Sequence, residues 1–277
     1  RYGAMNIAFY NGVSGLVAYQ QEMDLVSNNV ANVNTVGYKP SRASFSDLLY
    51  TQMWTNTDAL VNAGGDAGAQ DTADENGVGG MTDADGIHMQ GHGVRLAYSD
   101  LVFRQGNLLQ TEHPLDMAIK GDGFFAVERA NGTTEYTRNG AFDISIEGKS
   151  GYLVTSDGSY VLDASGKRIK LDRGDDDQFD LTNLQDEVGV YIFPNPYGLE
   201  PNTGGFRETP ISGTPTVIKA SSRASRPYTI VTGMLEQSAV DLSEEMANII
   251  VSQRAFQFSA KMVQTADEIE DTVNNLR

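Results

Sequence analysis

The chain contains 277 residues, with 37 acidic and 20 basic side chains, a formal net charge of −17 at pH 7 and no cysteine. The lack of cysteine excludes disulfides, thiolate chemistry and cysteine-ligated zinc. The acidic balance argues against nucleic acid and anionic membranes as partners, because both are bound through clusters of basic side chains. The sequence has no run of about 18 apolar residues, so membrane insertion is not expected.

A helix is expected from about residue 6 to residue 32, where apolar residues recur at coiled-coil spacing. This N-terminal stripe consists of Phe9, Val13, Leu16, Met23 and Val30, with Gln20 and Ser27 as polar members. Gly12 and Gly15 should weaken the helix by up to about 1 kcal/mol each relative to alanine. The Asn- and Gly-rich residues 28–37 end it, because both residue types tolerate left-handed backbone.

A second helix is expected from about Leu242 to Leu276, with Asp241 as its N-cap and Glu244 three residues later. Its C-terminal stripe consists of Leu242, Met246, Ile249, Phe256, Ala260 and Val263, followed by Ala266, Ile269, Val273 and Leu276. Isolated helices are marginal in water, so each stripe needs a partner. The two stripes should cover each other or a neighbouring copy; packing on the central domain is the alternative.

The middle of the chain contains two regions of different composition. Residues 39–93 are interpreted as a linker or extended loop, because Gly and Asp dominate its second half. Residues 94–232 contain short alternating segments separated by hairpin-type turns such as Asn131-Gly132 and Asp157-Gly158. The predicted fold class is therefore α+β, with a mainly antiparallel β central domain. N- and C-terminal amphipathic helices flank it and pair as a coiled-coil-like inner domain.

The expected domains follow from these zones. Residues 5–38 and 233–277 form a terminal helical domain, 39–93 the linker and 94–232 a β-rich outer domain. Met5 is the expected natural start, which would make residues 1–4 an addition to the chain.

Two patterns resemble binding sites without meeting their requirements. Residues 121–126 match the glycine pattern of dinucleotide sites, but an alternating strand follows instead of the helix that would hold the pyrophosphate. His88 and His92 have the spacing of two metal ligands on a helix, but the glycines around them predict a loop. We therefore assign no catalytic, cofactor-binding or metal-binding residue and expect no enzyme activity. A secreted cell-wall glycan hydrolase is the enzymatic alternative, because the many acidic residues offer carboxylate pairs.

Residues 28–39 resemble the N-terminal signature of the flagellar rod and hook proteins. Further blocks at 105–108, 114–125, 136–142, 193–199 and 233–242 resemble the same family in the same order. The residues that carry the resemblance include Asn28, Asn29, Asn32, Thr35, Gly37, Tyr38, Gly121, Gly123, Phe124, Phe125, Tyr136, Thr137, Arg138, Gly140 and Phe142. Within the family the chain resembles the distal-rod proteins most, with proximal-rod and other rod or hook relatives as alternatives.

The resemblance implies a structural subunit that polymerises helically into the drive shaft of the flagellum and transmits torque to the hook. It implies other copies, other rod subunits, the hook protein and the type III export apparatus as partners, with ring proteins as further candidates. It also implies no cofactor, and a basal-body location reached without a cleaved signal peptide. The expected assembly interface consists of Phe9, Val13, Leu16, Met23, Val30, Leu242, Met246, Ile249, Phe256, Val263 and Ile269. A β-rich adhesion protein with helical arms is the other alternative.

Overall fold

The computed structural model describes residues 7–54, 88–148, 150–171, 179, 181, 184–217 and 227–276. The elements in its N-terminal half are α1 (Ile7–Ala31), β1 (Ser41–Asp47), β2 (Tyr50–Trp54), β3 (His88–Gly91), β4 (Val94–Leu101), β5 (Leu108–Gln110), β6 (Met117–Gly121), β7 (Phe124–Glu128) and β8 (Thr134–Thr137). Those that follow are β9 (Phe142–Glu147), β10 (Ser150–Thr155), β11 (Tyr160–Val161), β12 (Lys170–Leu171), α3 (Leu184–Glu187), β13 (Val190–Ile192), η1 (Pro196–Gly198), β14 (Glu200–Asn202), β15 (Gly205–Arg207), β16 (Thr216–Val217), β17 (Tyr228–Thr232), β18 (Met234–Glu236) and α4 (Leu242–Asn275).

The chain divides into two compact units. Unit 1 comprises Arg1–Glu22, Ser44–Tyr98 and Val251–Arg277, and unit 2 comprises Met23–Ala43 and Ser99–Ile250. The elements α1, β1, β4 and α4 each contribute residues to both units.

Both long helices begin and end within one or two residues of their predicted bounds. The Oδ1 atom of Asp241 accepts hydrogen bonds from the backbone N–H groups of Ser243 (2.9 Å) and Glu244 (3.3 Å), which confirms the predicted N-cap. Among the described helices, none has an apolar stretch long enough to cross a membrane.

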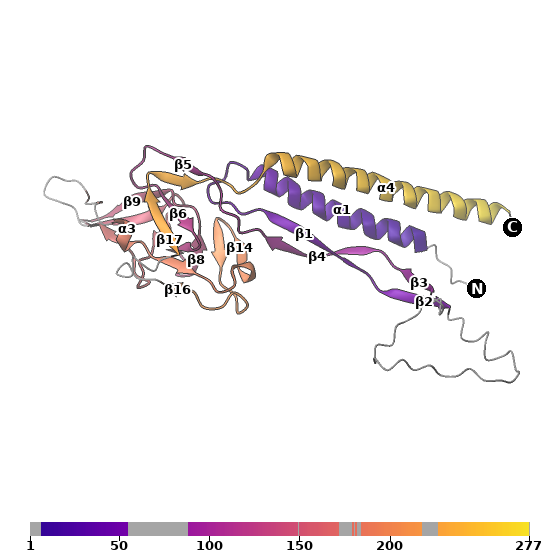
Figure 1. The fold of residues 1–277 in the computed structure, drawn as a ribbon, viewed down its shortest axis with the longest axis horizontal. Helices are drawn as coiled ribbons and strands as arrows, with labels where there is room; N and C mark the ends of the chain where they lie inside the picture. The colour runs from indigo at the N-terminus through magenta and orange to yellow at the C-terminus, as the bar shows by residue number, and fades with distance from the viewer. Residues whose placement is uncertain are drawn as a thin grey trace, which may run out of the picture. The chain divides into compact units, whose positions relative to one another are not determined.

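The terminal helices pair, as the fold class predicted, and lie side by side in Figure 1. In unit 1 the contact is made at glycines. A Cβ atom at Gly12 would lie 2.7 Å from Cγ2 of Val263, and one at Gly15 would lie 2.8 Å from Oγ of Ser259. The two glycines therefore permit a close approach of the helices that a side chain would prevent. This approach explains why glycine, a poor helix former, occupies both positions in α1.

This helix seam does not use the N-terminal stripe. Val13 and Leu16 each follow a seam glycine by one position, which turns their side chains by about 100° around the helix. Phe9 and Val13 accordingly remain 39% and 36% exposed, and Leu16 is half-buried. Burial of the two predicted stripes against each other is therefore not what pairs the helices within the chain.

Unit 1 has almost no apolar core of its own. Among its described residues, the buried apolar side chains are Ala18 and Ala266. Its exposed large apolar residues are Phe9, Tyr10, Val13, Val17, Phe45, Leu49, Tyr50, Tyr98, Val251, Phe258, Met262, Ile269, Val273 and Leu276. Because burial of apolar surface is the main favourable term in folding, unit 1 lacks the cover expected of an independently stable domain.

Unit 2 contains the antiparallel β region that the sequence predicted. Its largest sheet has ten strands, with the path β12-β10-β11-β7-β8-β15-β14, and β9, β13 and β16 pair off this path. The main core gathers around Met117, Ile119, Phe125, Leu153 and Val190, all at most 1% exposed. β17 pairs with β6 and β18 pairs with β5 in two smaller sheets, so the approach to α4 is part of the β region.

The segment expected as a linker differs from that interpretation where the structure describes it. Residues 41–47 form β1, which pairs with β4, and 50–54 form β2, which pairs with β3. Pairing with a distant strand supplies the backbone hydrogen bonds, and the local composition of 39–93 does not reveal it. The Gly-rich part at 55–87 lies outside the described residues.

Candidate assembly interface

The end of α1 is tied to the start of α4 by a buried amide in unit 2. Asn29 is 1% exposed, and its Nδ2 atom donates to the carbonyl of Ser41 (2.8 Å) and to Oε1 of Glu245 (3.0 Å). Its Oδ1 atom accepts hydrogen bonds from Ser41 N (3.0 Å) and from the Tyr38 hydroxyl (3.2 Å). One side chain thus fixes the helix end, the chain that follows it and the other helix.

Burial perturbs two of these groups. Loss of water raises the pKa of the Glu245 carboxyl, and the hydrogen bond from Asn29 only partly opposes this. Burial, and then the charge of Glu245, raise the pKa of the Tyr38 hydroxyl. Both shifts disfavour negative charge at this point of contact between the helices.

We expect Glu245→Gln to be neutral or to stabilise unit 2 by up to about 1 kcal/mol at pH 7, after allowance for solvent screening. Glutamine keeps an acceptor for Asn29 and carries no charge. Because the folded-state pKa is raised, the contribution of Glu245 to stability is complete below its unfolded pKa of about 4.5 and is lost as the pH rises through the folded value. Thermal unfolding between pH 4 and pH 7 should therefore show a weaker pH dependence in the variant.

Glu244→Gln serves as the control, because Glu244 is an exposed neighbour at the same helix start. Greater destabilisation by Glu245→Gln than by Glu244→Gln at pH 7 would contradict the expectation.

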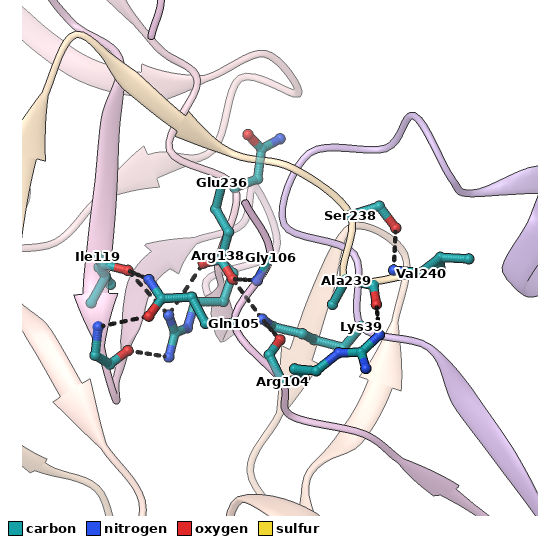
Figure 2. A network of polar contacts seen from close by, with 12 residues as sticks. Lys39, Arg104, Gln105, Gly106, Ile119, Arg138, Glu236, Ser238, Ala239 and Val240 are labelled. Atoms are coloured by element: carbon teal, nitrogen blue, oxygen red, sulfur yellow. Dashed lines mark hydrogen bonds and ion pairs between the residues drawn. The ribbon is translucent and has the colours of Figure 1, made fainter. Parts of the chain in front are cut away.

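A second polar network lies deeper in unit 2, around the carboxylate of Glu236 (Figure 2). Its Oε1 atom accepts hydrogen bonds from Lys39 Nζ (2.6 Å) and from Gly106 N (3.0 Å). Its Oε2 atom accepts from Arg138 Nη1 (3.2 Å). The side chains of Glu236 and Lys39 are 0% and 2% exposed, so this is a buried cluster of one anion and two cations.

Backbone carbonyls complete the cluster. Lys39 Nζ also donates to the carbonyl of Arg104 (2.7 Å), and Arg138 Nη2 donates to that of Gly121 (2.9 Å). The guanidinium of Arg138 lies over the ring of Phe124, 5.3 Å from its centroid. Burial lowers the pKa of both Lys39 and Arg138, and the charge of Glu236 opposes the shift at each. The carboxylate is therefore what makes two buried positive charges tolerable.

The resemblance residues converge on this network from separate stretches of chain. Gly37 lies against it at φ +70°, where a Cβ atom would lie 2.6 Å from the backbone carbon of Arg138. A Cβ at Gly140 would lie 1.6 Å from the carbonyl oxygen of Met117. Arg138 donates to Glu236 itself, and Gly121 accepts from Arg138. These blocks therefore maintain one structural junction, at which backbone segments approach too closely for other residues.

The remaining resemblance residues have structural roles as well. Phe124 and Phe125 are buried in the two core clusters, where Phe125 meets Phe142 with ring centroids 5.1 Å apart. Tyr136 packs edge-on against Phe193 at 4.7 Å. The others cap turns or border the junction: the Asn32 side chain donates to Asn28 and accepts from Thr35, Thr137 donates to the carbonyl of Gly204, and Gly123 adopts φ +133°.

Sequence reasoning did not assign Lys39, Gln105, Glu236 or Glu245 to a site. Gln105 donates to the carbonyl of Ile119 (2.9 Å) and accepts from Gly121 N (3.2 Å). The local signals that could have indicated buried polar groups were Glu236 directly after Gly233-Met234-Leu235 and Gln105 directly before Gly106. Lys39 and Glu236 are 197 positions apart, so nothing local links them.

The patterns weighed as chemistry have structural explanations where the chain is described. A strand, β7, follows the glycines of residues 121–126, as expected, and a Cβ at Gly123 would lie 2.4 Å from Cγ1 of Val190. His88 begins strand β3 and His92 follows its last residue, so the loop expected around them is a strand up to Gly91 and neither residue lies on a helix. Within the described residues, no three His, Asp or Glu side chains gather as a metal site would require.

A further apolar stripe lies on α4, one position before the seam residues Ser259 and Val263. This outer α4 stripe consists of Val251, Ala255, Phe258, Met262, Ile269 and Leu276, at steps of three, four or seven. Phe258 and Met262 are 67% and 52% exposed. The helix pair therefore presents apolar residues at coiled-coil spacing on both helices: Phe9 and Val13 of the N-terminal stripe, and the large residues of the outer α4 stripe. Leu16, Met23 and Val30 of the N-terminal stripe are half-buried. Of the other expected interface residues, Leu242, Met246 and Ile269 are exposed, and Ile249, Phe256 and Val263 are half-buried.

Three family descriptions match the chain in sequence order. "Flagella basal body rod protein" matches residues 9–39, "Flagellar hook protein FlgE/F/G D1 domain" matches 118–187, and "Flagellar basal body rod FlgEFG protein C-terminal" matches 231–276.

Individual relatives cover nearly the whole chain. The flagellar basal-body rod protein FlgG of Bacillus subtilis is 32% identical over 289 residues, with 98% of each chain covered. FlgG of Borreliella burgdorferi is 33% identical over 285 residues, again with 98% of each covered. The flagellar hook protein FlgE of Helicobacter mustelae is 36% identical over 156 residues, which cover 56% of this chain and 30% of the hook protein.

Proposed function

Because the chain belongs to the flagellar basal-body rod protein family, we propose that it is a structural, non-catalytic subunit of the flagellar rod. Copies polymerise helically into the drive shaft and transmit torque to the hook. The observation that carries the proposal is the helix pair of unit 1, which exposes Phe9 and Val13 on α1 and the large residues of the outer α4 stripe, and buries hardly any apolar side chain. Such a surface is explained by cover from neighbouring subunits.

Burial of the stripes between copies would supply free energy for assembly. Burying a phenylalanine or methionine side chain contributes about 1.5–3 kcal/mol, so Phe9 on α1 with Phe258 and Met262 on α4 would together supply a substantial part of a subunit contact. The N-terminal stripe of one copy and the outer α4 stripe of another are different surfaces. A contact between different surfaces is head-to-tail, and it generates a helical tube when the rotation does not close.

The proposed domain roles follow from this contact. The terminal helical domain, residues 5–38 and 233–277, forms the inner wall, and the β-rich residues 94–232 form the outer part. The expected interface residues that are half-buried in the single chain, Ile249, Phe256 and Val263, support the helix pairing. The exposed ones, among them Phe9, Val13 and Met246, meet other copies.

Location and partners are part of the same proposal. The FlgG relatives match along nearly the full chain whereas the hook relative matches about half of it, which favours a rod subunit over a hook subunit. The resemblance of the sequence blocks to distal-rod proteins makes the distal type the subtype that we propose. The subunit then contacts other rod subunits and the hook protein, and ring proteins are further candidates. It reaches the basal body through the flagellar export apparatus without a cleaved signal peptide.

Truncation after Asp241 tests the function in the source bacterium. The shortened chain lacks α4 but keeps β17, β18 and the Glu236 network, so its β region is expected to fold. We expect loss of hook and filament in electron micrographs and loss of motility, because the outer α4 stripe and the helix pairing are gone.

The full-length gene returned at the same locus is the control and should restore flagella. Circular dichroism of the purified truncated chain checks that the β region is folded. Normal flagella in the truncated strain would refute an essential axial role.

A further inference from the structure

Among the described residues, the most buried carboxylate is that of Glu236, in the last strand β18. Strand β17 pairs with β6, and the clasp segment that follows it, residues 233–239, pairs with β5 through β18. Between the two strands Gly233 turns at φ +67°, and its backbone N–H donates to the carbonyl of Asp116 (2.7 Å). After β18 the N–H of Gln237 donates to the carbonyl of Asn107 (2.8 Å). One edge of the clasp segment is therefore hydrogen-bonded to β5 and to the residues that flank it.

The clasp segment also holds the chain that leaves α1. The N–H of Gly37 donates to the carbonyl of Glu236 (2.8 Å), and the N–H of Ala239 donates to the carbonyl of Tyr38 (3.1 Å). The Lys39 ammonium reaches the Glu236 carboxylate in the same place. We call residues 37–41 the N-terminal arm. The clasp segment thus lies between the arm and strand β5 and is hydrogen-bonded to both.

Charge also couples the arm to the clasp segment. Within the described chain, the ion pairs of Lys39 and Arg138 both go to Glu236. Asp122 favours the charged form of Arg138 without forming an ion pair with it. When the clasp segment leaves, Lys39 keeps only the Arg104 carbonyl and faces a second buried cation across the vacated position. A buried ammonium in that situation is expected to move into water.

The clasp segment is attached beside the main sheet. β18 belongs to a two-stranded sheet and contributes no residue to either core cluster, whereas β17 supplies Tyr228 and Ile230 to the main core and β7 lies inside the ten-stranded sheet. Segments bound at an edge can open while the core remains folded, because fewer buried contacts are lost.

We propose that the clasp segment is a conformational switch in which docking of Glu236 locks the N-terminal arm, so that α1 and α4 are held as a pair only after the C-terminal end of the β region is in place. Opening releases Lys39, the arm and the end of α1 together. The consequence for assembly rests on the proposed function: a chain with an open clasp presents its stripes separately and cannot join the rod. The switch itself is a property of the free chain.

Native-state hydrogen exchange of the full-length chain in low urea tests the switch. We expect the amides of residues 233–239 and of Gly37 to exchange with one shared opening, ahead of the β7 amides. Acetic anhydride labelling, read by mass spectrometry, gives the second measure. In Glu236→Gln the labelling of Lys39 relative to exposed Lys167 and Lys261 should rise roughly 100-fold, the factor that corresponds to loss of a buried ion-pair partner.

Glu200→Gln removes one exposed carboxylate from the edge strand β14 and should leave Lys39 protected. Lys39 that stays unreactive in Glu236→Gln would overturn the proposal, and so would arm and clasp amides that exchange independently. Exchange of β7 together with the clasp would also overturn it, because the segment would then be an ordinary part of the core. If Glu236→Gln fails to fold, exchange of the unmodified chain decides by the same criteria.

The assembly proposal can fail separately. An unmodified chain that shows the shared opening but does not polymerise would leave the clasp intact and remove the rod function.

Discussion

Replacing Glu236 by alanine should lower the free energy of unfolding of unit 2 by about 3–5 kcal/mol, which is the typical cost of removing one partner of a buried ion pair. The substitution strands Lys39 and Arg138, whose charged forms burial already disfavours. It also leaves the backbone N–H of Gly106 without its acceptor. Urea unfolding followed by far-UV circular dichroism measures the loss.

A double-mutant cycle separates the charge from the packing. Lys39→Met keeps most of the side-chain volume and removes the ammonium, so Lys39→Met combined with Glu236→Ala should be less destabilised than the sum of the two single changes. Glu200→Ala, on the exposed edge strand, should change stability by no more than about 0.5 kcal/mol. Strict additivity of Lys39→Met and Glu236→Ala would show that the pair does not interact, contrary to its 2.6 Å distance.

Replacing Phe258 by aspartate should abolish polymerisation while leaving the free chain folded. The side chain is 67% exposed, so the single chain loses little. In the assembly the change removes about 1.5–3 kcal/mol of apolar burial at each contact and places a carboxylate in an apolar stripe, where it has no partner. Sedimentation and negative-stain microscopy of the purified chain, with motility of the mutant strain, provide the measurements.

Gln264→Asp is the matched control, because it adds the same charge to an exposed position of α4 outside the outer stripe. Phe256→Asp, at another residue of the expected interface, is less selective. Phe256 is half-buried in the single chain, so its replacement should disturb the chain itself as well as the assembly. Polymers of normal length from Phe258→Asp would exclude the outer α4 stripe as a subunit contact.

Both long helices followed from sequence because their signals are local. The Asp241 cap is completed within three residues, and the apolar spacing of α4 repeats within each turn. Hairpin turns at Asn131-Gly132 and Asp157-Gly158 are local in the same sense, and both glycines adopt positive φ. Strands β1 and β2 were missed because their partners, β4 and β3, are distant in the chain.

The candidate interface was only partly predictable. Periodicity identified the apolar residues of both helices, but an apolar arc wider than one stripe contains several possible seams. Gly12 and Gly15 decided which seam pairs the helices, because the absence of a side chain lets the backbones approach most closely there. Of the large residues beside them, Val13 is left exposed and Leu16 half-buried, so the seam that formed is not the one that the N-terminal stripe predicted.

Sequence by itself therefore determined the two helices and their limits, the antiparallel character of the middle and the family blocks, because each is encoded by residues within a few positions of one another. Only the tertiary structure decided which helix faces meet and that Lys39, Arg138 and Glu236 form one buried cluster. Those outcomes depend on close backbone approach and on charge compensation between residues as many as 197 positions apart, and neither leaves a periodic trace in the chain.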